Sequence, residues 1–368
     1  MKGVTCITDT SLERVPRPTA RNEILLTRAG VAVVLLACIM LARDMGVVFL
    51  QVWQAQRWGA AALHVVFFFI IAFLIYGSFV YLLTRLAYQR RRSTHRPASR
   101  TQLHALYQGP APALTILVPA YKEDAAVVAQ TLWSALLQDY PNRRVVLLID
   151  NPPQTGSATD AAELLTMRTL PARLQQILAR PRRRFAACLA AFERRAAAGA
   201  IDPQQELVRL SRLYAEVAAW FEDLALRQNI TGHTDMLFVE KILHWHRDAH
   251  VLQARELRLR QPDMQRQPDQ GELLAHYRRL AALFSAEVSA FERKLYANLS
   301  HEPNKAMNLN SYIGLVGKSF CVRGEGVQRT LEPADPAQAD LSVPDTDFFI
   351  TLDADSLILP DYALRLVH

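Results

Sequence analysis

Three aspartates follow apolar segments that have the length and composition of buried strands. Asp150 comes directly after residues 145–149. Asp353 and Asp355 come after residues 348–352 and are separated by one alanine. Two carboxylates two positions apart on a turn can converge on one hard cation, while a diphosphate supplies the remaining oxygen ligands. Because such a cation neutralises the charge that develops on a diphosphate leaving group, these residues predict a nucleotide and metal site.

The expected place of these aspartates in a sheet is more informative than their spacing. A pair of aspartates separated by one residue occurs by chance in many chains, and Asp150 alone is an ordinary residue for the turn after a strand. In open α/β sheets, however, ligands bind outside the carboxyl ends of the strands. Asp150 and Asp353 are both expected at that edge.

The chain before Asp150 has the pattern of a strand, a helix and a second strand. Residues 114–119 are a continuous apolar run, and residues 125–137 carry apolar side chains at helical spacing. Asp124 is the expected N-cap of this helix. Apolar runs without alternation, such as 145–149, indicate strands that are covered on both faces. We therefore predict an α/β domain with a mostly parallel sheet.

Two apolar segments near the N-terminus are long enough to cross a membrane, which takes about 20 residues. Residues 58–83 contain no formally charged side chain, and residues 29–50 are apolar apart from Arg43 and Asp44. A cleavable signal peptide is the alternative for the earlier segment. Its apolar run begins late, however, and no convincing small-residue cleavage site follows it. We predict a two-helix transmembrane hairpin within residues 24–84.

Arginines on both sides of this hairpin predict its orientation. The turn between the two segments carries a single arginine, whereas both outer flanks carry several. The positive-inside bias then places residues 1–23, the basic juxtamembrane linker 85–112 and the soluble domain in the cytoplasm. We expect a multi-pass protein of the inner (plasma) membrane. The flanking arginines are Arg14, Arg17, Arg21 and Arg28 before the hairpin, and Arg85, Arg90, Arg91, Arg92, Arg96 and Arg100 after it.

The formal net charge of +7 fits nucleic acid, anionic lipid or ordinary solubility. Because the arginine cluster of residues 85–100 contains no acidic residue and directly follows an apolar segment, we expect membrane lipids and no nucleic acid as its partner. The four cysteines show no CxxC spacing, which argues against a disulfide framework and a zinc knuckle.

Three blocks of the chain resemble the family-2 glycosyltransferases of GT-A fold, in the membrane branch of the cellulose and hyaluronan synthases. The first block covers residues 115–123 and continues to Gln138-Asp139-Tyr140-Pro141. The second, residues 304–310, is similar to the family segment Gly-Lys-Ala-x-Ala-Leu-Asn. The third, residues 350–355, is similar to the metal motif of the family. The blocks occur in the order that the family has.

The resemblance implies a GT-A (Rossmann-like) domain and a metal-dependent, inverting glycosyltransferase. A UDP-sugar would be the donor, a growing polysaccharide or a glycolipid the acceptor, and Mg²⁺ or Mn²⁺ the cofactor. Asp353 and Asp355 would bind the metal, and Lys305 would face the diphosphate as a point charge. The donor nucleotide would be bound by Pro119, Ala120, Tyr121, Glu123, Asp150, Lys305 and Asp353.

The chain also departs from the family pattern. Lys122 stands where the family usually has asparagine, and Asn304 stands where it has glycine. No segment after Asp355 supplies the later catalytic-base aspartate or the Gln-x-x-Arg-Trp motif of the family. The catalytic residue is therefore unknown, and we expect the front part of a longer enzyme or a truncated copy.

A large helical insertion, residues 155–300, is predicted between two parts of the GT-A domain, residues 113–154 and 301–368. Apolar side chains recur at helical spacing along residues 207–224 and 273–295. These stripes indicate amphipathic helices that pack on one another or on the catalytic domain. A partner-binding or membrane-lying role is the alternative.

Two other functions stay open at this point. A catalytically inactive scaffold would use the insertion to recruit partners, and a related enzyme would transfer a single sugar to a lipid phosphate. His244, His246 and His250 lie in the insertion without a zinc-binding pattern around them. We expect these histidines to be solvated or to cap a helix.

Overall fold

The computed structural model describes four stretches of the chain, residues 20–95, 98–154, 156–260 and 267–367. They fall into two compact units, Met1–Pro97 and Ala98–His368. Of the arginines expected to flank the hairpin, Arg14, Arg17 and Arg96 lie outside the described stretches, as does Cys6. The other three cysteines are free thiols.

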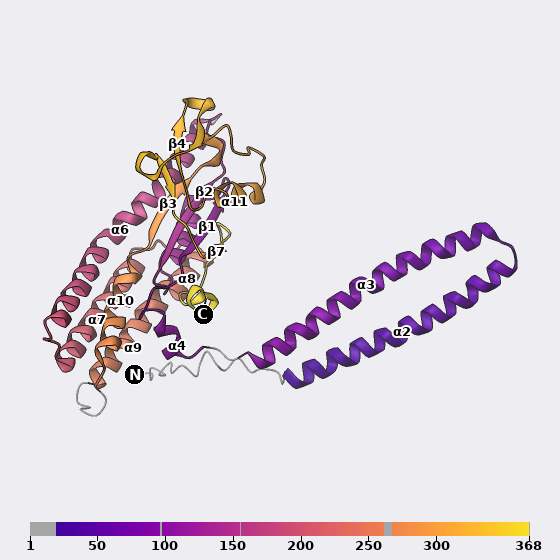
Figure 1. Ribbon diagram of the computed structural model, residues 1–368, viewed down its shortest axis with the longest axis horizontal. Coiled ribbons are helices and arrows are strands. Elements are labelled where there is room, and N and C mark those ends of the chain that lie inside the picture. The colour runs from indigo at the N-terminus through magenta and orange to yellow at the C-terminus, as the bar shows by residue number, and fades with distance from the viewer. Residues whose placement is uncertain (1–19, 96–97, 155, 261–266, 368) are drawn as a thin grey trace. The chain divides into compact units, whose positions relative to one another are not determined.

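The first unit is a pair of long helices, α2 (Ala20–Gln54) and α3 (Trp58–Thr94), that lie side by side (Figure 1). In the described part of the chain, these are the two helices that are long and apolar enough to cross a membrane. Almost none of their apolar side chains is buried. Both helices are longer than the predicted spans. Because arginine favours helix and no proline intervenes, α3 continues through Arg92.

The second unit is an α/β domain built on a parallel sheet. Within the described residues, four strands pair in the order β3-β2-β1-β7, and each neighbouring pair is parallel (Figure 1). The prediction of a parallel α/β fold is confirmed. The strands are β1 (Leu114–Ala120), β2 (Arg143–Ile149), β3 (Glu287–Phe291) and β7 (Phe348–Thr351).

Helix α5 (Ala125–Leu136) connects β1 to β2, as the apolar pattern predicts. Asp124 is its N-cap, with a carboxylate oxygen that accepts a hydrogen bond from the amide of Ala126 at 2.8 Å. The side chains of Val128 and Leu132 are fully buried against the sheet. The local sequence therefore determines this βαβ unit.

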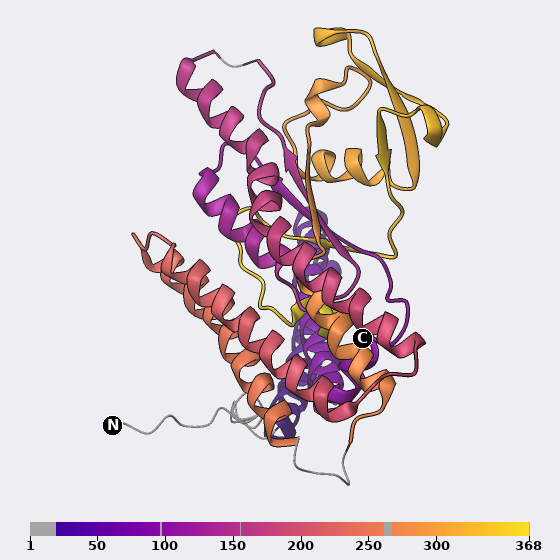
Figure 2. The ribbon, with the colours of Figure 1, turned by 90° about the vertical axis from the view of Figure 1, so that its left-hand side faces the viewer.

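The insertion is mostly helical, as predicted, and its helices pack in pairs. Helix α6 packs on α10 and helix α7 packs on α9 (Figure 2). Asp202 caps α7 and Pro203 occupies its first turn, where a missing N–H costs nothing. The helical elements are α6 (Ala158–Ala197), α7 (Pro203–Leu226), α8 (His233–Phe238), the π-helix η1 (Val239–His244), α9 (Trp245–Arg260) and α10 (Gln270–Leu283).

The end of the predicted insertion is not helical, and this part of the prediction is wrong. The apolar stripe 273–295 covers most of α10, the whole of β3 and the short 3-10 helix of residues 293–295. Helix α10 stops at Leu283, and β3 then adds to the edge of the sheet, with Phe291 opposite Leu148 of β2. Val288 and Phe291 are three residues apart, which is helical spacing, but a run of five residues is too short for spacing to decide the conformation. Pairing with β2 decides it.

The histidines of the insertion also differ from expectation. His246 and His250 are buried, not solvated, because α9 packs on the apolar face of α7. The ring of His246 is stacked on that of Phe221, with 4.5 Å between their centroids. Burial lowers the pKa of His250 to about 4, so this side chain is neutral at physiological pH.

The remaining elements surround the ends of the main sheet. Strand β4 pairs with β5 and β6 in an antiparallel sheet of three strands within the described residues. These elements are α4 (Arg100–Ala105), η3 (Arg293–Leu295), α11 (Lys305–Ile313), β4 (Lys318–Arg323), η4 (Gly326–Gln328), β5 (Thr330–Pro333), η5 (Pro336–Gln338), β6 (Leu341–Val343) and α12 (Tyr362–Val367).

Candidate functional site

A cavity of about 410 Å³ lies at the carboxyl edge of the parallel sheet. The residues that the sequence predicts for nucleotide and metal binding all line it, although they come from the ends of three strands and from one helix. The predicted residues in its wall are Pro119, Ala120, Tyr121, Glu123, Asp150, Lys305, Asp353 and Asp355. Pro303, Asn304, Asn308 and Ala354 also line the cavity.

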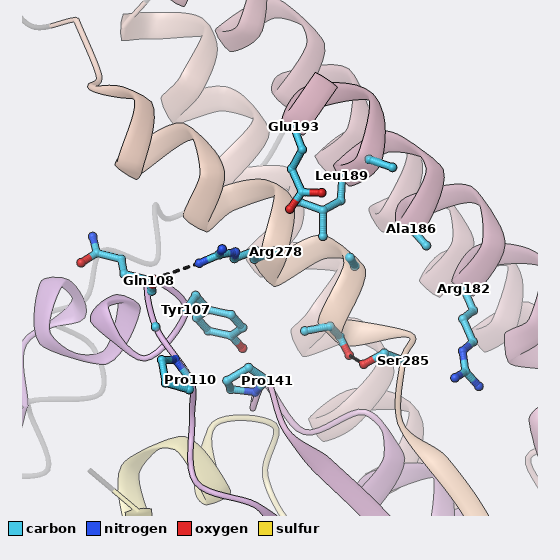
Figure 3. A pocket seen from close by; sticks show the side chains of 14 residues that line it. Tyr107, Gln108, Pro110, Pro141, Arg182, Ala186, Leu189, Glu193, Arg278 and Ser285 are labelled. Atoms are coloured by element: carbon cyan, nitrogen blue, oxygen red, sulfur yellow. Dashed lines mark hydrogen bonds between the residues drawn. The ribbon is translucent and has the colours of Figure 1, made fainter. Parts of the chain in front are cut away.

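A larger cavity, of about 690 Å³, lies between α6, α10 and the segment before β1 (Figure 3). Its wall is mostly apolar, and its charged groups are spread around it. Arg278 donates a hydrogen bond to the carbonyl of Gln108 at 2.9 Å, and Arg182 is paired with Glu287 at 3.2 Å. Glu193 is the single acidic side chain in the wall of the larger cavity, whereas four acidic side chains and Lys305 line the smaller one, so the smaller cavity is the candidate site.

Asp353 and Asp355 both lie on the turn after β7 and are exposed to solvent. Lys305 forms an ion pair with Asp353. Lys305 begins α11, and the side chain of Asn304 caps this helix by accepting a hydrogen bond from the amide of Ala306 at 2.8 Å. Asparagine is among the residues that helix N-caps favour.

Buried polar side chains on α5 and just beyond it hold the aspartate turn. Thr131 Oγ1 donates a hydrogen bond to the carbonyl of Ala354, between the two aspartates, at 2.7 Å. Two residues after the end of α5, Gln138 Nε2 donates to the carbonyl of Leu359 at 2.8 Å. Thr131, Ser134 and Gln138 are all buried, and their spacing places them in one column along the helix. This column of three polar side chains fixes the turn relative to the sheet.

Replacing Thr131 with valine should loosen this turn. The variant keeps the shape of the side chain but leaves the Ala354 carbonyl without its donor, at a cost of about 1–3 kcal/mol. We expect amide hydrogen exchange in residues 352–358 to rise about fivefold or more when measured by mass spectrometry on the full chain in detergent. Thr166→Val on the exposed face of α6 is the control. Unchanged exchange in the Thr131 variant would contradict the role of the column.

Asp150 is engaged by a cation that the sequence did not predict. Arg293, which is fully buried, donates from Nε to one carboxylate oxygen of Asp150 at 2.8 Å and from Nη2 to the other at 3.1 Å. The same guanidinium donates to the carbonyls of Ser300 and Glu302. Arg293 therefore joins the end of β2 to the loop that leads into α11.

Arg293 was not predicted as a site residue because the apolar stripe around it suggests a helix. A signal for it was nevertheless present, since Arg293 follows β3 at the same edge of the sheet where Asp150 follows β2. Lys294, the next residue, donates to the backbone carbonyl of Asp150 at 2.6 Å. Recognition of residues 287–291 as a strand would have placed both cations at the site.

Tyr121 offers a half-exposed aromatic ring at the mouth of the cavity. The ammonium groups of Lys122 and Lys294 lie 5.8 and 5.5 Å from the centre of this ring. Lys122 adopts a left-handed backbone conformation, with φ of 54°, and its amide donates to Asn151 Oδ1 at 3.0 Å. Lysine adopts this conformation less readily than asparagine does.

The carboxylate oxygens at the aspartate turn could hold a divalent cation only if a bound ligand supplies further oxygen atoms. In the part of the chain that the structure describes, no group of three or more histidine, cysteine or acidic side chains is arranged to hold a metal. Asp353 and Asp355 offer hard oxygen atoms, and Mg²⁺ is often bound by one or two carboxylates plus phosphates of the substrate. These residues fit that mode of binding.

The chain's own residues carry the interpretation of this site. Comparisons with protein families, with curated proteins and with solved structures find no match for this chain. What the geometry offers is a pair of exposed carboxylates, a lysine, an aromatic ring and a buried carboxylate–guanidinium pair around one cavity. This set suits a ligand with an anionic end and a planar, polar end.

Proposed function

We propose that this chain binds a UDP-sugar with Mg²⁺ or Mn²⁺ in the 410 Å³ cavity and acts in a membrane-bound glycosyltransferase. The acceptor would be a growing polysaccharide or a glycolipid. One observation carries the proposal: residues chosen from separate sequence blocks meet in one cavity at the carboxyl edge of the sheet, where ligands of α/β proteins bind.

Each group in the cavity has a chemical role in this proposal. Asp353 and Asp355 would hold the cation, which neutralises the charge on the leaving diphosphate. Lys305, beside them, would donate to a phosphate oxygen, and the ring of Tyr121 would stack on the base. The inverting reaction forms one bond, from an acceptor hydroxyl to the anomeric carbon, and breaks the bond to the diphosphate. The group that takes the acceptor proton is not assigned.

The helices α2 and α3 would anchor this activity in the inner (plasma) membrane. Arg85, Arg90, Arg91 and Arg92 lie on the C-terminal turns of α3. In the proposed topology they meet the anionic headgroups of the cytoplasmic leaflet, each contributing about 1 kcal/mol, and the α/β unit is cytoplasmic.

The cation dependence of UDP binding tests the proposal. In calorimetry on the full chain in detergent micelles, Mn²⁺ is expected to tighten UDP binding by about tenfold or more. Asp353→Ala combined with Asp355→Ala should abolish this gain, because the cation loses both protein ligands. Glu325→Ala, which removes an exposed carboxylate elsewhere, is the control.

Two results would count against the proposal. An equal gain from Mn²⁺ in the double variant would remove the metal role of the aspartates. No detectable binding of UDP under any of these conditions would favour the inactive scaffold instead. The alternative reaction, transfer of a single sugar to a lipid phosphate, would be distinguished from the proposed one by identifying the product that forms from a radiolabelled donor.

A further inference from the structure

Helix α2 carries two adjacent charged residues, Arg43 and Asp44, inside its apolar segment. The nearest charged residues on either side of them are Arg28 and Arg57. A membrane core takes about 20 helical residues, so any core placed between Arg28 and Arg57 includes both charges. In the proposed membrane anchor, Arg43 and Asp44 therefore lie within the hydrocarbon. Ionisable side chains at that depth are costly, and they mark an interaction or a function.

These two side chains lie outside the face of α2 that α3 covers. Val34, Cys38 and Met45 recur at the spacing of one helix face and are partly buried, whereas Arg43 and Asp44 are exposed. Since α2 packs on α3 in this unit, the partly buried face is the one that meets α3. At about 100° per residue, Arg43 and Asp44 both point away from that face.

The hairpin offers this pair of charges no partner at its depth. Residues 58–83 of α3 contain no formally charged side chain. In the described part of the chain, neither Arg43 nor Asp44 forms a hydrogen bond or an ion pair with another residue. The two charges are thus open to a second transmembrane helix.

The pattern of this face favours α2 of a second copy of the chain. Adjacent helical residues differ by about 1.5 Å along the axis, so the cation and the anion lie at nearly the same depth. Identical chains that insert in the same direction meet through a two-fold axis, which places residue i of one copy beside residue j of the other. Arg43 of each copy then lies beside Asp44 of the other. A partner helix with a charge of one sign would leave one of the two groups unpaired.

Exposed apolar side chains occupy the same face between the two charges. Leu36, Met40 and Val47 point, around the helix axis, into the sector between Arg43 and Asp44, and all three are exposed in the single chain. In a two-fold contact these three side chains would meet their own copies at the centre, with an ion pair on each side.

Resting on the proposed membrane anchoring, we infer that α2 binds α2 of a second copy of this chain within the membrane, through two reciprocal ion pairs between Arg43 and Asp44. The contact satisfies both charges at once, where each would otherwise face hydrocarbon. Polar side chains that pair across transmembrane helices hold such helices together.

Two variants with charges of opposite sign test this inference. Arg43→Asp gives a face with two anions and Asp44→Arg a face with two cations, so each variant keeps two charges in the span. Energy transfer between fluorescently labelled full chains in phosphatidylcholine vesicles measures association. Each variant alone is expected to associate about tenfold or more weakly than the wild type, because like charges meet. A mixture of the two variants should recover wild-type association, because each anion again faces a cation.

Two further variants complete the experiment. Arg57→Asp changes an exposed charge in the turn between α2 and α3, so it is the matched control and should associate like the wild type. Arg43→Leu combined with Asp44→Leu makes the span wholly apolar, so insertion into the membrane is favoured. This double variant should also associate about tenfold more weakly, because the polar contact is lost.

The outcomes separate this inference from the proposed anchoring. Extraction of the vesicles with alkaline carbonate shows whether a chain is embedded in the bilayer, and removal of the wild-type chain would mean that the anchoring itself fails. An embedded wild-type chain without energy transfer would overturn the α2 contact. Wild-type association in the double leucine variant, or a mixture that associates no better than either charge variant alone, would do the same.

Discussion

Replacing Arg293 with methionine is expected to lower the free energy of unfolding by about 3–5 kcal/mol. The variant leaves the carboxylate of Asp150 buried without its bidentate partner, and it removes the donor from the carbonyls of Ser300 and Glu302. Lys294 lies 3.4 Å from Asp150 Oδ1 and compensates only in part, because a single ammonium cannot replace a fork of donors.

Urea unfolding of the full chain in detergent, followed by tryptophan fluorescence, measures this effect. Asp150→Asn in the Arg293→Met background should recover part of the loss, since it removes the unpaired charge. Arg323→Met is the control, because its pairing with Glu332 is exposed and long, at 3.9 Å. A cost below about 1 kcal/mol for Arg293→Met would show that the buried pair does not hold the site together.

A loss of similar size, about 3–5 kcal/mol, is expected for Arg279→Met. Arg279 on α10 donates to both carboxylate oxygens of Asp139, at 3.1 and 2.5 Å, and Tyr107 donates to the same carboxylate at 2.6 Å. Burial acts to raise the pKa of Asp139, but the charge and hydrogen bonds of Arg279 bring it well below the usual value. The ion pair thus stays charged in a buried place and fastens the insertion to the segment that follows α5.

The same unfolding experiment measures this second effect, with Arg184→Met as the control. Arg184 pairs with Glu216 at 3.1 Å on the surface, where such a pair contributes about 1 kcal/mol or less. Combining Arg279→Met with Asp139→Leu should cost less than the sum of the two single changes, because the double variant buries no unpaired charge. Strict additivity would mean that the two side chains do not interact as the structure indicates.

Much of the candidate site was predictable because its signals are local. The runs before Asp150 and Asp353 are apolar without alternation, which is typical of a strand covered on both faces. Parallel strands bring their carboxyl ends to one edge, so these two aspartates, far apart in the sequence, could be placed together before any contact was known. The caps of α5 and α7 follow from the aspartates that precede them.

The partners of these residues were not predictable in the same way. Arg293 depends on β3, and residues 287–291 become a strand because β2 offers a free edge. His246 has a polar side chain, yet it is buried where α9 packs on α7. No local pattern distinguishes Asn308, whose amide is matched to a carbonyl of β2 while its oxygen is left without a partner among the described residues.

The sequence by itself determined the parallel α/β unit, the two apolar helices and the aspartates at the edge of the sheet. Their signals are burial and spacing within one segment, which are properties of neighbouring residues along the chain. Only the tertiary structure decided that Arg293 neutralises Asp150 and that Lys305 pairs with Asp353. It also decided that the side-chain oxygen of Asn308 is buried without a hydrogen-bond partner among the described residues. These are contacts between separate segments, and their energies depend on which groups packing removes from water.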